Sequence, residues 1–250
     1  MKRIEVIGIE GIPEVSPGDD LADLIIRAVR AEGLEFLPGD ILVVTQKVVS
    51  KAEGRLVSPD EVEPSPFAVE VGRMLGKDPR VVEVILREAS RIVRMDSGVL
   101  ITETKHGFIC ANSGVDASNV SASGRLLLLP EDPDASAARI RAAIMRATGV
   151  EVPVIISDSF GRPWREGIVN VAIGVSGMLP ILNYRGQSDS HGVTLRVTQM
   201  AIADEIASAS ELAAGKVDGI PVVIIRGGCY VKGEGSAREL LREPGKDLFR

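Results

Sequence analysis

The chain has 250 residues, of which 45% are hydrophobic and 26% charged, and these proportions are typical of globular domains with a packed core. Its 29 Lys and Arg oppose 35 Asp and Glu, so the net charge of −6 excludes an overall positive field that would bind nucleic acid or an anionic membrane. No cleavable signal, membrane-spanning apolar run, zinc spacing or disulfide framework is evident, so we expect a cytoplasmic protein in which any nucleotide is bound by a local basic site.

The first 90 residues alternate between strand and helix patterns. Apolar runs predict strands over 3–9 and 40–46, and VVSKAEGRLV continues the second strand as a less regular segment. Helical periodicity predicts helices over 19–32, 67–76 and 79–89. The proline-rich stretch SPDEVEPSPF predicts a loop before the second of these helices.

Residues 91–114 alternate as antiparallel strands, with Gly98 and Gly107 marking the turns. The rest of the chain predicts further strands over 125–130, 152–159 and 220–227, and helices over 133–149 and 193–215. This mixture predicts an α+β fold in which the strands are largely antiparallel. We expect one unit over 1–250, built from two closely packed subdomains whose boundary falls between about 90 and 125.

Neither a GxxxxGK[ST] loop nor a GxGxxG turn is present, so a nucleotide would have to be held by other means. Four polar segments are candidates for a metal and phosphate site. In IISDSFGRPWREG, Asp158 follows a buried apolar run, where an ionised carboxylate is costly unless it is paired, hydrogen-bonded or metal-bound. With Ser159 it supplies the hard oxygens that Mg²⁺ or Mn²⁺ accepts. The alternative is a helix or turn cap, which residue type alone favours.

Two further segments place polar groups where a strand ends. In ANSGVDASNV, Asp116 and Asn119 would orient a metal and a phosphate oxygen, whereas the alternative is an ordinary polar turn. In TQKVVSKAEGR, Thr45 and Gln46 would bind phosphates and the ammonium groups of Lys47 and Lys51 would neutralise them. The alternative is a solvated basic edge.

The fourth segment, AIADEIASASELAAGK, combines acids with small side chains in a helical pattern. Small residues allow close packing against a ligand, and Glu205 would complete a metal shell. The alternative is a solvated helix face, because a glutamate on a helix is ordinarily exposed.

Five separated blocks, in this order and over nearly the whole chain, resemble the F420-0:γ-glutamyl ligase family: IEVIGIEGIPEV, VVTQKVVSKAEGR, GFICANSGVDASN, IISDSFGRPWREG and ADEIASASEL. The family joins L-glutamate to the lactyl carboxylate of F420-0, then adds another glutamate through its γ-carboxyl, while GTP is hydrolysed to GDP and phosphate. The resemblance therefore implies a GTP-dependent ligase, with F420-0 and L-glutamate as substrates and an intertwined homodimer as its assembly.

The resemblance also implies which residues form the site. The metal ligands would be Asp116, Asp158, Ser159 and Glu205, holding two divalent ions, Mg²⁺ or Mn²⁺, beside a monovalent cation such as K⁺. Relatives often carry Thr at position 159, which keeps the hydroxyl. The residues expected to contact GTP are Ile12, Pro13, Glu14, Val15, Thr45, Gln46, Lys51, Asn119, Ala203, Asp204, Ile206, Ala207, Ser208, Ala209 and Ser210.

A carboxylate is a poor acylating agent, so the implied reaction requires transfer of the γ-phosphoryl group to form an acyl phosphate. Such a transfer depends on charge neutralisation and positioning, and we expect no covalent nucleophile from the protein. Arg162 and Arg165 would bind phosphate or the substrate carboxylates, with structural pairing to Glu166 or Asp158 as the alternative.

Two other functions use the same residues. A metal-dependent phosphatase or nucleotidase would need the same acids, and a non-catalytic nucleotide-binding protein would need only the phosphate contacts. A ligase differs from both because it releases phosphate from GTP only when both F420-0 and glutamate are present.

Overall fold

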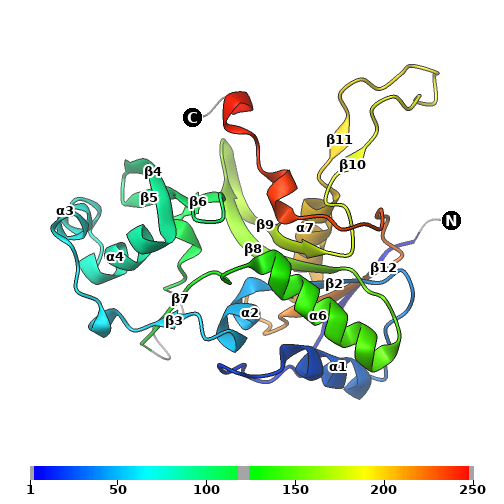
Figure 1. Ribbon diagram of the computed structural model, residues 1–250, viewed down its shortest axis with the longest axis horizontal. Coiled ribbons are helices and arrows are strands. Elements are labelled where there is room, and N and C mark those ends of the chain that lie inside the picture. Colours follow the sequence, from blue (N-terminus) through cyan, green and yellow to red (C-terminus); the bar gives the residue numbers. More distant parts are fainter. Residues whose placement is uncertain (1–2, 118–123, 248–250) are drawn as a thin grey trace.

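The computed structural model describes residues 3–117 and 124–247 and is organised around a five-stranded sheet (Figure 1). Neighbouring strands in this sheet pair antiparallel, except that β2 and β8 are parallel. The mixture of helices and largely antiparallel strands confirms the predicted α+β fold. In sheet order, the strands are β1 (Glu5–Ile9), β12 (Val222–Arg226), β2 (Ile41–Thr45), β8 (Val154–Arg162) and β9 (Arg165–Ser176).

Helices cover both faces of the sheet because its central strands are apolar on both sides. Leu42 and Val44 belong to one buried cluster, whereas Ile41 and Val43, which point the opposite way, belong to another. α7 packs on the second cluster. The helices on the first side are α1 (Leu21–Ala31), α2 (Gln46–Ala52) and α6 (Pro133–Thr148), and that on the second is α7 (Ile202–Ala214).

Helix ends follow local sequence signals, as α6 shows. The Asp132 carboxylate accepts a hydrogen bond from the Ala135 N–H, and Pro133 occupies the first turn. The helix ends at Gly149, whose φ of 74° is the left-handed conformation that glycine adopts at little cost. The prediction of a helix over 133–149 is confirmed.

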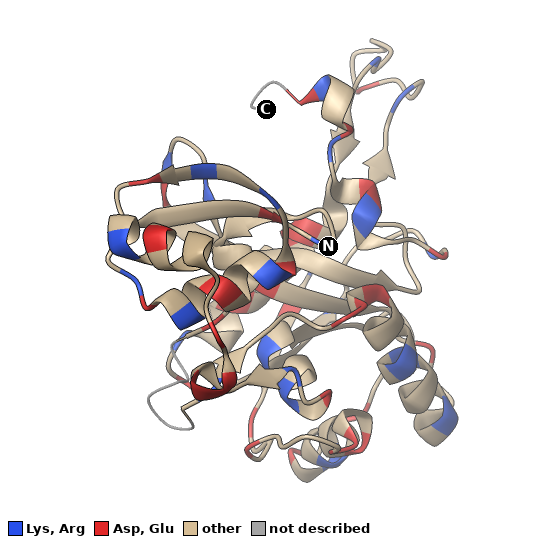
Figure 2. Cartoon of the chain, turned by 60° about the vertical axis from the view of Figure 1, so that its left-hand side comes forward, with Lys and Arg blue, Asp and Glu red and all other residues tan. Residues whose placement is uncertain are grey.

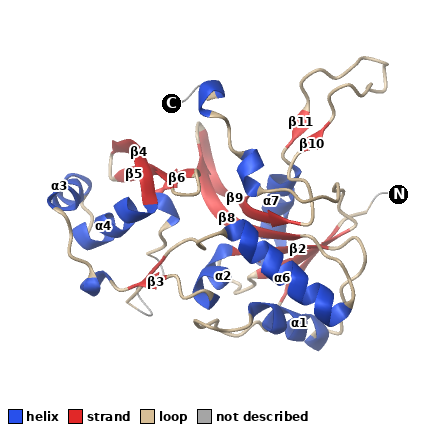
Figure 3. Cartoon of the chain, viewed as in Figure 1, coloured by secondary structure: helices blue, strands red, loops and turns tan. Residues whose placement is uncertain are grey.

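Two predicted elements differ from the structure. Residues 46–52 form α2 rather than a continuation of the preceding strand. The helix predicted over 193–215 begins only at Ile202, and the residues before it belong to an arm formed by β10 (Leu182–Asn183) and β11 (Gln199–Met200). The arm projects from the body and is mostly loop (Figure 3). The period-two spacing of Val193, Leu195 and Val197 is typical of extended chain, in agreement with the structure of the arm.

A smaller subdomain, residues 58–115, lies beside the sheet and has its own apolar core, which includes Val84, Ile85 and Leu100. The predicted hairpin turns at Gly98 and Gly107 are confirmed, since both glycines have positive φ between paired strands. Acidic and basic residues alternate along its helices and strands (Figure 2). Its elements are α3 (Pro66–Leu75), α4 (Pro79–Glu88), β4 (Ala89–Asp96), β5 (Val99–Thr104) and β6 (Ile109–Ala111).

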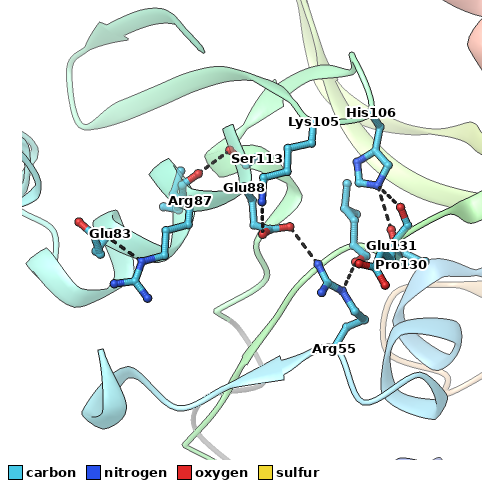
Figure 4. Close-up of polar contacts among 11 residues, drawn as sticks. Arg55, Glu83, Arg87, Glu88, Lys105, His106, Ser113, Pro130 and Glu131 are labelled. Carbon is cyan, nitrogen blue, oxygen red and sulfur yellow. Dashed lines mark hydrogen bonds and ion pairs between the residues drawn. The ribbon is translucent and has the colours of Figure 1, made fainter. Parts of the chain in front are cut away.

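The chain enters and leaves the subdomain through a two-stranded neck, β3 (Leu56–Val57) and β7 (Leu126–Leu127). The strand predicted over 125–130 is thus confirmed only near its start, at Leu126 and Leu127. Polar contacts beside the neck join the two parts (Figure 4). The Glu88 carboxylate binds Arg55 at 3.0 Å and Lys105 at 3.2 Å, and His106 Nε2 lies 2.9 Å from the Pro130 carbonyl oxygen. Within the described ranges, no helix has the length and apolarity needed to cross a membrane.

Candidate functional site

A cavity of about 570 Å³ opens where the sheet, the neck and the subdomain meet. Beyond the pair Thr45 and Ser157, β8 continues along β9 alone, so that Asp158 and Ser159 border this opening. The strand predicted over 152–159 therefore does not end at Ser159 but runs on to Arg162 in a hairpin. The lining includes Ile12–Val15, Thr45–Val48, Lys51, Ala111, Gly114–Asp116, Ser157–Ser159, Ile168, Asn170, Glu211, Ala214–Lys216 and Gly219–Pro221.

The Asp158 carboxyl is strongly affected by its surroundings in the cavity. Burial raises its pKa to about 6, and the nearby Asp116 carboxylate adds to the rise. The Ser159 N–H, which donates to Asp158 Oδ1 at 2.8 Å, and the ammonium groups of Lys216 and Lys47 oppose it. A carboxylate that is poorly compensated by the protein itself is suited to binding a cation.

Asp116 is presented by a strained turn. Asn112, Ser113 and Gly114 have φ values of 53°, 54° and 69°, a left-handed run that is costly for residues with side chains. Buried hydrogen bonds fix this turn: Ser113 Oγ donates to the Ile85 carbonyl at 2.9 Å, and the Ser113 N–H donates to Thr102 Oγ1 at 2.9 Å. The turn thereby delivers Asp116 to the cavity, where its Oδ2 pairs with Lys47 Nζ at 2.9 Å.

Ser159 belongs to a closed ring of polar side chains from β8, β9 and the end of α7. Its hydroxyl donates to Asn170 Oδ1 at 2.7 Å, and Asn170 Nδ2 donates to Glu211 Oε2 at 2.8 Å. Lys216 Nζ closes the ring, since it donates to Ser159 Oγ at 2.5 Å and lies 3.4 Å from Glu211 Oε1. Asn170 is only 3% exposed, so the ring is anchored in the protein and opens to the cavity through Lys216.

The cavity is also lined by the loop of residues 12–15 and by the first residues of α2, both of which contain predicted nucleotide contacts. Lys51, whose side chain is 17% exposed, pairs with Glu14 at 2.5 Å, which ties the loop to α2. Gln46 is buried, and its Oε1 accepts a hydrogen bond from Ser50 at 2.8 Å. The structure thus brings ten of the predicted residues to one cavity: Ile12, Pro13, Glu14, Val15, Thr45, Gln46, Lys51, Asp116, Asp158 and Ser159.

The predicted residues of α7 lie elsewhere. Glu205 is exposed and does not line this cavity, so within one protomer it does not join Asp116 and Asp158. Ala203, Ile206 and Ala207 are buried in the sheet's second core, and Asp204 accepts a hydrogen bond from the Ala172 N–H. The members of this segment outside the cavity lining are Ala203, Asp204, Glu205, Ile206, Ala207, Ser208, Ala209 and Ser210, and their ligand roles remain predictions.

The tip of the β8–β9 hairpin also lies outside the cavity lining. Arg162 Nη2 donates to the Glu166 carbonyl oxygen at 2.6 Å. Glu166 is one of the two structural partners given as the alternative to substrate binding, but the contact is made by its backbone and not by its carboxylate. Arg165 is exposed. Asn119, a predicted nucleotide contact, lies outside the described residues.

The donor set of the cavity fits a metal that is shared with a ligand. Among the described residues, no group of three or more His, Cys, Asp or Glu is placed to hold a metal. Asp116, Asp158 and the Ser159 hydroxyl would supply only part of a coordination shell. This suits Mg²⁺ or Mn²⁺, since such ions commonly bind one or two carboxylates together with substrate phosphates and water.

Three cavity residues were missed by the sequence analysis as ligand-site candidates: Asn170, Glu211 and Lys216. Asn170 interrupts a β-branched run, GIVNVAIG, and that polar interruption in a buried strand was the available signal. Cys110, near Asp158, is a poor nucleophile, because burial and the Asp158 charge raise its thiol pKa to about 12.

The sequence is similar to a described family and to enzymes from several archaea. The profile of the family described as F420-0:Gamma-glutamyl ligase matches residues 9–227. The Coenzyme F420:L-glutamate ligase of Methanothermobacter thermautotrophicus is 47% identical over 250 residues, covering 99% of each chain. The protein of that name from Methanopyrus kandleri is 49% identical over 253 residues, covering 99% of this chain and 97% of its own. The protein of that name from Methanocaldococcus jannaschii is 46% identical over 252 residues, covering 100% of this chain and 98% of its own.

Proposed function

The chain belongs to the F420-0:gamma-glutamyl ligase family, and from this premise we propose that it joins L-glutamate to coenzyme F420-0 and then to the product, with GTP as the energy source. The observation that carries the proposal is the convergence in one cavity of Asp116, Asp158 and Ser159 with Lys51 and the 12–15 loop. Acids and lysines around one opening are what phosphoryl transfer requires, since its main demand is positioning and charge neutralisation.

In this proposal, divalent ions are held by Asp116, Asp158 and Ser159. Mg²⁺ or Mn²⁺, accompanied by a monovalent ion such as K⁺, would neutralise the phosphate charge of the bound nucleotide. Asp158 is fitted to this role because its charge is unfavourable in the protein alone, as its raised pKa shows. Asp116 and Lys47 sit across from it and compensate each other at 2.9 Å.

The reaction would proceed in two steps. A carboxylate oxygen of F420-0 attacks the γ-phosphorus of GTP, forming the acyl phosphate and releasing GDP. The neutral amine nitrogen of glutamate then attacks the acyl carbon, phosphate leaves with that carboxylate oxygen, and the proton lost from the nitrogen passes to the phosphate or to water. Lys51, which is largely buried beside the cavity, would hold the phosphate charge, and the walls of the cavity would keep water from the acyl phosphate.

Arg162 and Arg165 remain our candidates for the substrate carboxylates, because both lie on the hairpin whose base carries Asp158. Arg165→Ala should raise the KM for F420-0 or glutamate about 3-fold to 10-fold with little change in kcat, the cost of one charged hydrogen bond at an exposed position. Steady-state kinetics with each substrate varied would measure this, and an unchanged KM for both substrates would reject the assignment.

We further propose a cytoplasmic homodimer. The arm around β10 and β11 leaves Val193 and Val197 61% and 79% exposed, which is apolar surface that a second copy would cover. Light scattering of the purified protein would measure the mass, and a strictly monomeric protein would contradict this part.

Coupling separates the ligase from a phosphatase or nucleotidase. With GTP and Mn²⁺, the purified protein should release phosphate at an appreciable rate only after both F420-0 and glutamate are added, and the product mass should rise by one glutamyl residue. Phosphate release at the same rate with and without F420-0 and glutamate would support the hydrolase. Normal GTP binding without any product would support a non-catalytic protein.

A further inference from the structure

Lys216 holds an oxygen that the proposed function assigns to a divalent ion. We propose that Lys216 and a divalent cation are alternative occupants of Ser159, and that the ion displaces the Lys216 ammonium group, which then binds the phosphates of the nucleotide. This inference rests on the proposed function for the identity of the ligands, but its geometry comes from the ring of Ser159, Asn170, Glu211 and Lys216.

The ring fixes the direction of the Ser159 hydroxyl. Glu211 only accepts hydrogen bonds, so the group that faces it at 2.8 Å must be the Asn170 amide nitrogen, and the Asn170 amide oxygen must face Ser159. The Ser159 proton is therefore directed at Asn170. The lone pairs of Ser159 Oγ are left for a cation, and Lys216 Nζ lies at 2.5 Å from this atom.

An ammonium group and a divalent ion cannot both contact one hydroxyl oxygen without strong repulsion. Both would lie within a few ångströms of each other, and like charges at such a distance in a partly buried site repel strongly. The carboxyl of Asp158, adjacent in the chain, favours the ion of higher charge. The ion is therefore expected to take Ser159 and to release Lys216.

Lys216 is free to make this movement. Its side chain is 52% exposed, it follows the end of α7, and its second partner, Glu211, is 3.4 Å away. Lys216 lines the cavity, so a rotation of its four-carbon side chain away from Ser159 would bring the ammonium group to a phosphate bound there.

Lysine labelling measures the displacement directly. The full-length protein is treated with an amine-acetylating reagent during a Mn²⁺ titration, and the labelling of each lysine is read by peptide mass spectrometry. Lys216 labelling should rise about 5-fold to 10-fold, as expected when a charge-assisted hydrogen bond is lost. The midpoint should equal that of Mn²⁺ binding measured by electron paramagnetic resonance. A non-hydrolysable GTP analogue should then lower the labelling again.

Matched variants isolate the cause. Lys246, an exposed lysine paired with Glu243 on another element, should keep its labelling throughout. In Ser159→Ala, Lys216 should label rapidly without Mn²⁺ and show no further rise. Lys216→Met should tighten Mn²⁺ binding without nucleotide, whereas Lys246→Met should not change it.

The outcomes distinguish this inference from the proposed function. Mn²⁺ binding with unchanged Lys216 labelling, or weaker Mn²⁺ binding by Lys216→Met, would overturn the displacement while leaving the ligase proposal intact. A protein that makes the glutamyl product but never binds Mn²⁺ in this cavity would overturn the displacement and the metal assignment together. A protein that shows the displacement but forms no product would overturn the ligase proposal alone.

Discussion

The two walls of the cavity are built in different ways. The sheet wall carries Asp158, Ser159 and Asn170 on paired strands that lie between two apolar cores. The subdomain wall carries Asp116 on a turn with three successive left-handed residues. The first wall is therefore positioned by regular strand pairing within the buried core of the molecule. The second depends on a strained turn and on polar contacts at the neck.

This difference suggests that the two walls have different roles in the site. Groups on the sheet wall are positioned by regular strand pairing and do not depend on left-handed residues, so they are suited to fixing the charges on which phosphoryl transfer depends. The subdomain wall is joined to the body by the neck and by contacts such as Arg55 with Glu88, which can open without unfolding the sheet. We infer that changes in the sheet wall affect chemistry most, and that changes in the subdomain wall affect the closure of the site.

Asp158→Asn should give the largest effect. The substitution keeps the shape of the side chain but removes the charge that would hold a cation, so kcat/KM for ligation should fall at least about 100-fold, equivalent to about 3 kcal/mol. Product formation by mass spectrometry measures the loss, and circular dichroism verifies that the fold is retained. Activity within a factor of two of the wild type would show that the sheet wall does not carry the chemistry.

Gly114→Ala should damage the subdomain wall instead. A Cβ at this residue would lie 2.8 Å from Leu129 side-chain atoms, and φ is 69°. We expect a loss of roughly 2–3 kcal/mol in the free energy of unfolding, measured by urea denaturation. Gly76→Ala is the matched control, since its φ is 64° and its Cβ would meet no atom within 4 Å. Equal losses in both variants would show that the contact with Leu129 does not matter.

The pH dependence of stability should reveal the cost of the Asp158 charge. Because its pKa is raised to about 6, the native protein binds this proton more tightly than the unfolded chain does. The associated stability is present below about pH 4 and is lost as the pH rises to about 6. Asp158→Asn avoids that loss, so it should stabilise the protein by up to about 3 kcal/mol at pH 8 and by almost nothing at pH 4.

Urea denaturation of the wild type and of Asp158→Asn at the two pH values measures this difference. Asp96→Asn should show the opposite sign, because Arg94 and Ser97 lower the pKa of Asp96. A stabilisation by Asp158→Asn that is equal at pH 4 and pH 8 would contradict the origin in charge burial.

Glu88→Gln should loosen the neck with a smaller effect. It weakens the ion pair with Arg55, which joins the subdomain to the body, and we expect a cost of about 1–2 kcal/mol in the docking of the subdomain. Hydrogen exchange should accelerate in α4 and β4–β6 but not in β8. Glu70→Gln, which removes only an exposed pair within α3, should change neither. Faster exchange in β8 would show that the two walls are not independent.

The fold could be predicted well where local chemistry decides the structure. Asp132 and Gly149 bound a helix by capping and left-handed φ, and both signals are visible in the sequence. The arm was misread because Val193, Leu195 and Val197 lie directly before a true helix, and the helical pattern was extended back across them.

The site could be predicted only in part. Asp158 and Ser159 are adjacent in the chain, so the sequence shows them together, and the Asp116 segment could be proposed from its composition. Asn170, Glu211 and Lys216 form a ring with Ser159 through tertiary contacts between residues up to 57 positions apart. Each is unremarkable by itself, and only the packing of α7 against β9 unites them. The exposure of Glu205 likewise depends on how α7 is turned, which short-range pattern does not determine.

Oxygen labelling tests the central claim most directly, namely that this cavity transfers the terminal phosphoryl group of GTP to a carboxylate. F420-0 labelled with ¹⁸O in its lactyl carboxylate would be ligated to glutamate by the purified protein, and the released phosphate would be analysed by mass spectrometry. Passage through an acyl phosphate predicts one ¹⁸O atom in each phosphate released. Unlabelled phosphate accompanying formation of the glutamyl product would contradict the account.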